Sequence, residues 1–135
     1  MPEVKPRDLC QRTFQFACEI VRLSRTISRE PGASRQIAWQ LLRAGTSVGA
    51  NAEEAKAAYS RRDFAAKTAL VLREARETHY WLRLIEATAA PSSTALLSLL
   101  TEANELVSIY TVAVRKAKGP IGEVRTEKEE LRRTE

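Results

Sequence analysis

Three glutamates in the middle of the chain, Glu54, Glu74 and Glu77, are the residues best suited to hold a metal ion. Helical bundles bind pairs of metal ions through glutamates combined with two Glu-x-x-His motifs. This chain has one histidine, His79, and the residue three positions before it is Arg76, so neither motif is present. A site built from the three carboxylates alone stays open as an alternative, but we expect basic residues to face them. We therefore expect neither a bound metal nor a cofactor.

Motifs for nucleotide hydrolysis and for nucleophilic catalysis are also missing from the sequence. The run G-T-S-V-G at residues 45–49 lies inside a helical pattern and does not follow a strand, as a phosphate-binding loop does. Serine and cysteine nucleophiles lack an elbow motif and have no histidine other than His79. Tyr59, Tyr80 and Trp81 could form a platform on which bases stack, although Trp81 also suits the core or an interface. We expect a protein without enzymatic activity.

Basic side chains are the other group that could do chemistry, because lysine and arginine bind phosphates. The formal net charge is +5, and residues 119–135 carry four basic and five acidic residues. The remainder therefore carries 18 basic and 12 acidic residues, a net charge of +6. This excess permits a polyanionic partner without proving one. The candidate contacts with nucleic acid are Arg22, Arg25, Arg29, Arg61, Arg62, Arg73, Arg76, Arg83, Arg115, Lys116 and Lys118.

The elements that must position these residues are long helices. Hydrophobic residues make up 44% of the chain and charged residues 29%, which suits a folded protein. Apolar residues recur every three or four positions, the spacing of an amphipathic helix. Pro31-Gly32, the segment 89–93 and Gly119-Pro120 interrupt this pattern. The first helix is expected from about Asp8 to about Ser28.

Helix-capping residues mark where the later helices begin. Ser34 is the expected N-cap of the second helix. The motif S-R-R-D, which starts at Ser60, places a cap before the third helix and an acid three residues later. Ser92 or Ser93 is expected to cap the fourth helix.

The second helix has an unusually small middle section. Gly45 and Gly49 are poor helix formers, so their presence suggests that another helix approaches closely there. Asn51 falls in the apolar middle of the same helix, where we expect it to bond to a backbone group or a polar neighbour and to fix the register. The fourth helix has a broad apolar stripe, which suits contact with another subunit as well as with the core.

Facing positions across the central helical hairpin can be estimated from its turn. If the hairpin turns near residue 60, the numbers of facing residues add up to about 121. Glu54 then faces Lys67, and Arg43 faces Glu77, one turn from Glu74. We expect Arg43 to pair with Glu74 or Glu77, and Glu54 to pair with Lys67, in partly buried ion pairs.

Together these elements predict an all-α fold, an up-down-up-down four-helix bundle. We expect residues 1–118 to form the bundle and residues 119–135 to form a mobile, charged C-terminal tail. No apolar run approaches the length of a bilayer, and no signal-peptide core follows Met1. Cys10 and Cys18 lie eight residues apart on one predicted helix, too far for a disulfide. These features predict a cytoplasmic protein with no membrane contact.

Three runs in the middle of the chain resemble a known family. They are Q-L-L-R-A-G-T-S-V-G-A-N-A-E-E-A at 40–55, S-R-R-D-F-A-A-K at 60–67 and L-R-E-A-R-E-T-H-Y-W-L-R-L-I at 72–85. They resemble the four helix bundle protein family, which includes proteins encoded in intervening sequences of bacterial 23S ribosomal RNA genes and the accessory protein of diversity-generating retroelements. The resemblance covers roughly residues 7–118. The matched positions look like a structural signature: Arg43, Asn51, Glu54, Asp63, Phe64, Lys67, Glu74, Glu77, Tyr80 and Trp81.

The resemblance implies a homopentameric ring and no catalytic residues. In one branch of the family it also implies binding of nucleic acid and of a reverse transcriptase through a basic surface. Our leading hypothesis is a basic, self-assembling scaffold that binds RNA or DNA, beside a nucleic-acid enzyme. The alternative is a structural or protein-binding module that does not bind nucleic acid. Its surfaces would be the apolar stripe of the fourth helix and the small-residue face of the second.

Overall fold

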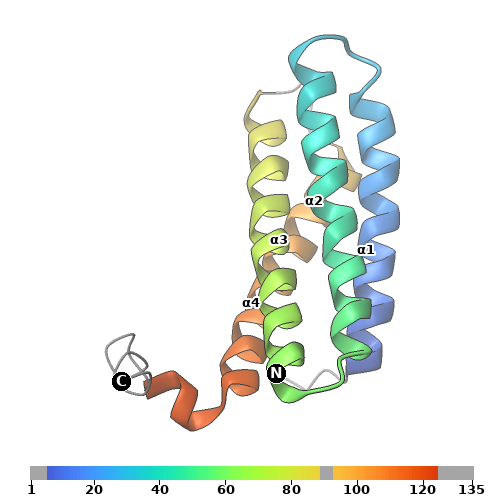
Figure 1. The fold of residues 1–135 in the computed structure, drawn as a ribbon. Coiled ribbons are helices and arrows are strands. Elements are labelled where there is room, and N and C mark those ends of the chain that lie inside the picture. The colour runs from blue at the N-terminus through green and yellow to red at the C-terminus, as the bar shows by residue number, and fades with distance from the viewer. Residues whose placement is uncertain (1–5, 89–92, 125–135) are drawn as a thin grey trace.

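Apolar residues at helical spacing fold the chain into four long helices. The computed structural model describes residues 6–88 and 93–124, and for residues 6–8 and 120–124 it describes the backbone alone. The helices are α1 (Pro6–Ile27), α2 (Ala33–Lys56), α3 (Arg61–Thr88) and α4 (Thr94–Val124). Successive helices run in opposite directions and pack against one another, and α4 also contacts α1 (Figure 1). The predicted all-α, up-down-up-down bundle is confirmed.

All four helices contribute to a single apolar core. α1, α2 and α3 run side by side, and α4 crosses behind them at an angle, so that its C-terminal end extends away from the other three (Figure 1). Buried threonines in the core donate their hydroxyl hydrogen to a backbone carbonyl four residues earlier, so that these hydroxyls are hydrogen-bonded although they are buried. The largest fully buried side chains are Ile20, Leu41, Val48, Val71, Leu82 and Leu106.

The small middle section of α2 is explained by the close approach of α1. A Cβ atom added at Gly45 would lie 2.6 Å from Cγ2 of Ile20, and one added at Gly49 would lie 3.3 Å from the backbone oxygen of Thr13. Both glycines are buried. The close approach predicted from the two glycines is therefore confirmed. It also means that these glycines face α1 and leave no free surface for a partner, contrary to the alternative hypothesis.

The starts of the helices agree with the sequence in two cases and differ in one. The Ser60 hydroxyl accepts a hydrogen bond from the backbone N–H of Asp63 at 3.0 Å, as predicted. Ser93 caps α4 by accepting from the N–H of Leu96 at 3.1 Å, whereas Ser92 lies outside the described residues. The prediction of Ser34 as a cap is wrong. The N-cap of α2 lies two residues earlier, at Gly32, with φ 82° and no side-chain cap bond.

The C-terminal boundary of the bundle also differs from the expectation. We expected the fourth helix to stop at Gly119-Pro120, because proline lacks the N–H that continues a helix. Gly119 does leave the helical conformation, at φ 73°, but helical backbone resumes and continues to Val124. The chain therefore bends at Gly119 instead of ending its helix there. Residues 125–135, the rest of the expected tail, lie outside the described part of the chain.

Candidate functional site

The polar cluster between α2 and α3 is an ion-pair network. Arg43 contacts Glu77 through Nη2, and its Nη1 lies 3.7 Å from Oε2 of Glu74. This is the pairing that the hairpin register predicts for Arg43. The Glu74 side chain is 16% exposed, and its buried Oε2 accepts no hydrogen bond. The arginine therefore neutralises two carboxylates that we had considered as metal ligands.

The second predicted pair does not form. Glu54 is exposed, Lys67 is half-buried, and the two make no ion pair in the described structure. The estimate fails here because an exposed glutamate near the end of α2 can remain in water, so nothing compels it to pair. Asn51 donates through Nδ2 to the backbone oxygen of Ser47 at 2.9 Å, within its own helix. It therefore satisfies a backbone group, but this bond does not connect two helices and cannot fix their register.

An ion pair that our sequence analysis did not predict joins α1 to α4. Arg12 donates to both oxygens of Glu102, at 2.7 and 2.6 Å, and to Glu105 at 2.8 Å. The hydrogen bonds to Glu102 raise the pKa of Arg12. The sequence feature that could have indicated this ion pair is the three-residue spacing of the two glutamates, which places both on one face of α4. Arg12 is thus held within the bundle.

The eleven candidate nucleic-acid contacts are all exposed, but they divide among three places. Because the helices alternate in direction, the C-terminal ends of α1 and α3 meet at one end of the bundle, with Arg22, Arg25, Arg29 and Arg83. Arg22 there is paired with Glu19. The middle of α3 carries Arg73 and Arg76. The other end, near the α2–α3 turn, carries Arg61, Arg62, Arg115, Lys116 and Lys118.

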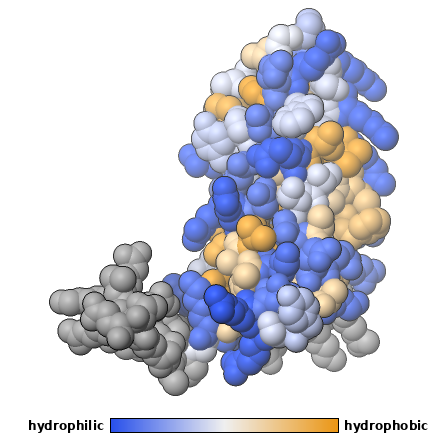
Figure 2. All heavy atoms as spheres, in the orientation of Figure 1, coloured by the Kyte–Doolittle hydropathy of each residue, from blue (hydrophilic) through white to orange (hydrophobic). Residues whose placement is uncertain are grey.

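We define the basic end as the five cations near the α2–α3 turn together with Lys56. Lys56 was not among the predicted contacts, although it ends α2 only five residues before Arg61. The Arg61 guanidinium reaches the bend in α4, where Nη2 would lie 3.9 Å from a Cβ added at Gly119. Hydrophilic and apolar side chains are interspersed at this end of the molecule (Figure 2). Among the side chains that the structure describes, the acids of the same region are Glu53, Glu54 and Asp63.

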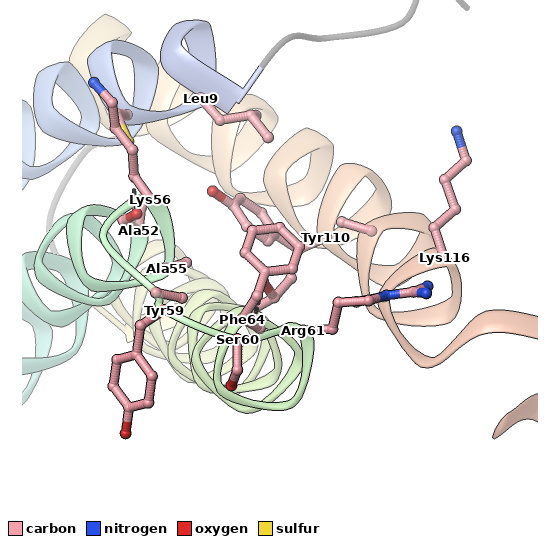
Figure 3. A pocket seen from close by; sticks show the side chains of 15 residues that line it. Leu9, Ala52, Ala55, Lys56, Tyr59, Ser60, Arg61, Phe64, Tyr110 and Lys116 are labelled. Carbon is pink, nitrogen blue, oxygen red and sulfur yellow. Dashed lines mark hydrogen bonds between the residues drawn. The ribbon is translucent and has the colours of Figure 1, made fainter.

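A pocket of about 720 Å³ opens at the basic end, between α1, the α2–α3 turn and α4. We call it the end pocket. Its walls are largely apolar and include Leu9, Ala55 and Phe64, with the ring of Tyr110 from α4 (Figure 3). The cations Lys56, Arg61 and Lys116 also line it, whereas none of its described lining residues is acidic. The end pocket thus combines an apolar interior with positive charge.

Burial disfavours ionisation of two weakly acidic groups that line the end pocket, the Tyr110 hydroxyl and the Cys10 thiol. Desolvation raises the pKa of Tyr110 strongly, and the nearby Cys10 adds to the effect. Desolvation also raises the pKa of Cys10, with a further contribution from Glu53. Both groups are therefore neutral at physiological pH, and the Tyr110 hydroxyl can act as a hydrogen-bond donor. The pocket gains no negative charge from either side chain.

Other kinds of site find no support in the described residues. No group of three or more histidine, cysteine or acidic side chains is arranged there to hold a metal ion. None of the helices, as far as they are described, is long and apolar enough to cross a membrane. Tyr80 and Trp81 form an edge-to-face pair with ring centroids 5.0 Å apart, whereas Tyr59 is 92% exposed at the basic end. The three aromatic residues therefore do not form one platform.

Comparisons with known proteins agree with this architecture. No curated protein matches the chain. One similar solved structure is the crystal structure of a protein of unknown function from the S23 ribosomal protein family of Bacteroides thetaiotaomicron. It is 32% identical, covers 79% of this chain and 98% of its own, and superposes with a TM-score of 0.71. The family described as "23S rRNA-intervening sequence protein" matches residues 6–111. The chain therefore belongs to the 23S rRNA-intervening sequence protein family.

Proposed function

We propose that this protein is a non-enzymatic, self-assembling helical bundle that binds nucleic acid through its basic end. The observation that carries the proposal is the convergence of six exposed cations from α2, α3 and α4 at one end of the bundle. Three acids accompany them among the described side chains, which gives these nine residues a net charge of +3. Because phosphates attract such a surface and release their counterions on binding, the affinity should fall as salt rises.

The test compares two variants that lose equal charge at opposite ends. The first is Lys56→Gln/Arg61→Gln/Arg62→Gln at the basic end. The matched control is Arg25→Gln/Arg29→Gln/Arg83→Gln, which removes three exposed cations from the other end. Filter binding of a fluorescent RNA at rising salt measures the slope of log K against log salt. Each phosphate contact contributes about 0.7 to this slope for a single strand.

We expect the basic-end variant to lose about 2 units of slope and the control to keep the slope of the unmodified protein. Equal losses in both variants would assign the binding to overall charge and refute the role of the basic end. If the unmodified protein does not bind at low salt, or if its affinity does not change with salt, nucleic-acid binding itself is refuted. RNA is the first probe because the family is named for 23S rRNA, and DNA of the same sequence is the second.

Self-assembly is part of the proposal, with a homopentamer as the expected form. It is supported by apolar side chains that α4 leaves exposed: Leu97 and Val112 are each 49% exposed. Exposed apolar side chains on a helix often mark contact with another subunit. Static light scattering at micromolar concentration gives the mass directly. A mass near 15.1 kDa would refute assembly, whereas five times that mass would support the pentamer.

The second candidate function is a module that binds another protein and no nucleic acid. The same exposed residues of α4 support it, but the small-residue face of α2 does not, because α1 covers its glycines. A reverse transcriptase or another nucleic-acid enzyme is the expected partner. Pull-down with such an enzyme after nuclease treatment separates direct contact from contact through nucleic acid. Retention that survives nuclease, together with no affinity for RNA or DNA, would favour this function.

A further inference from the structure

We infer that the end pocket takes up an unpaired nucleobase, so that the basic end binds single-stranded RNA or DNA in preference to a blunt duplex. This inference rests on the proposed function and names the class of nucleic acid. A basic surface alone does not distinguish single strands from duplexes, because both carry phosphates. The pocket beside it supplies the distinction.

The end pocket has the size and lining of a small-ligand site. Its volume of about 720 Å³ lies within the usual range for such pockets, about 300–1,000 Å³. A planar base needs apolar surface for its faces and polar groups for its edges. Apolar and aromatic walls provide the first, and the hydroxyl of Tyr110 provides the second. Tyrosine is protonated at neutral pH, and burial raises the pKa of Tyr110 further, so its hydroxyl can donate to a base.

Aromatic rings are present where a base would enter. Phe64 from α3 and Tyr110 from α4 project into the same space, whereas Tyr59 points away from it into solvent (Figure 3). Stacking on an aromatic ring is how proteins hold unpaired bases without requiring a particular sequence. Phe64 is half-buried and Tyr110 is buried, so Phe64 is the ring with more accessible surface.

The charges around the opening suit a strand that passes across it. Lys56 lies on one side of the pocket, and Arg61 and Lys116 lie on the other (Figure 3). Phosphates on both sides of an inserted base would thus meet cations, and no described lining residue would repel them. A base inside a duplex is stacked and paired, and removing it costs free energy. A duplex would therefore use the cations but not the pocket.

The decisive probe is a 12-nucleotide RNA with 2-aminopurine at its centre, whose fluorescence is quenched when the base stacks. We compare the single strand, its blunt duplex, and a single strand with an abasic site at the same position. We expect the single strand to be quenched on binding and to bind about 5- to 150-fold more tightly than the abasic strand, the usual contribution of one base–aromatic stack. The duplex should bind without quenching.

Two variants locate the base. Phe64→Leu keeps apolar volume but removes the ring, and Ala113→Phe narrows the pocket without touching a cation. Both should reduce quenching and lower single-strand affinity toward that of the abasic strand. Phe14→Leu is the matched control, since Phe14 is 60% exposed on α1 and lies outside the pocket. Circular dichroism confirms that each variant folds, and a fold defect in one leaves the other to decide.

The outcomes separate this inference from the proposed function. Equal affinity for the single strand, abasic strand and blunt duplex, with normal salt dependence and no quenching, overturns the base pocket and keeps nucleic-acid binding. No salt-dependent binding of any of the three overturns both. Decanoate also carries a negative head on an apolar body, so it serves as a competitor. If decanoate binds and the oligonucleotides do not, the pocket belongs to an apolar carboxylate.

Discussion

The contact between Gly45 and Ile20 allows a sharp prediction about the stability of the fold. In Gly45→Ala, the new Cβ would lie 2.6 Å from Cγ2 and 2.8 Å from Cγ1 of Ile20. Ile20 is fully buried, and a β-branched side chain has little freedom to rotate away. Helix propensity alone would make alanine more stable than glycine by about 1 kcal/mol. Overpacking in a core costs about 1–3 kcal/mol. After the gain in helix propensity is subtracted, we expect a net loss of up to about 2 kcal/mol.

Urea unfolding followed by circular dichroism measures this change at one fixed protein concentration, because assembly would make stability depend on concentration. Ala50→Gly calibrates the helix term, since Ala50 is exposed on the same helix. It should cost about 1 kcal/mol. Ile20→Ala removes both Cγ atoms and should itself cost about 2–5 kcal/mol.

A double-mutant cycle then separates packing from propensity. In the Ile20→Ala background, Gly45→Ala no longer meets a Cγ atom, and the contact that remains is with the Cβ of residue 20, at 3.0 Å. We therefore expect the overpacking cost of Gly45→Ala, about 1–3 kcal/mol, to fall in this background. Gly45→Ala should thus be less destabilising in the Ile20→Ala background than in the unmodified protein. If Gly45→Ala stabilises the unmodified protein by the full helix term, about 1 kcal/mol, then α1 and α2 do not pack closely at Gly45 and overpacking is refuted.

Three further changes test the ion pair, a helix cap and the histidine. Arg43→Gln leaves the carboxylates of Glu74 and Glu77 without their cation and should lower the free energy of unfolding by about 1–3 kcal/mol. Arg62 is exposed, so Arg62→Gln should change the free energy of unfolding by less than about 0.5 kcal/mol. Ser60→Ala removes a cap and should cost about 1 kcal/mol, but Ser34→Ala should be neutral, and an equal cost would restore the rejected cap. Burial lowers the pKa of His79, so the unfolded chain takes up the proton first as pH falls. Stability should therefore decline below the unfolded pKa of about 6.5 and level off below the folded pKa, a slope that His79→Gln should lack in pH-dependent urea unfolding.

Predictions from the sequence succeeded where the interaction is local or lies within one hairpin. The Ser60 cap depends on residues three positions apart, and the Arg43–Glu77 contact follows from a short turn and helical spacing. They failed where solvent competes. Glu54 is exposed and makes no pair with Lys67, although the register places them opposite each other. The helical register specifies which residues face each other. It does not specify whether two charged side chains are more stable as an ion pair or hydrated separately.

The order of residue types determines the number of helices, their directions and the close α1–α2 contact at Gly45. Apolar periodicity, helix-breaking residues and glycines, which lack a side chain, all act over short distances along the chain. The end pocket, the Arg12–Glu102 bridge and the meeting of Lys56 with Arg61 and Lys116 are not determined in this way. They depend on the angle at which α4 crosses the other helices, which is set by how all the core side chains pack at once. No single stretch of the chain encodes that angle, so only the folded structure brings these cations and aromatic rings to one opening.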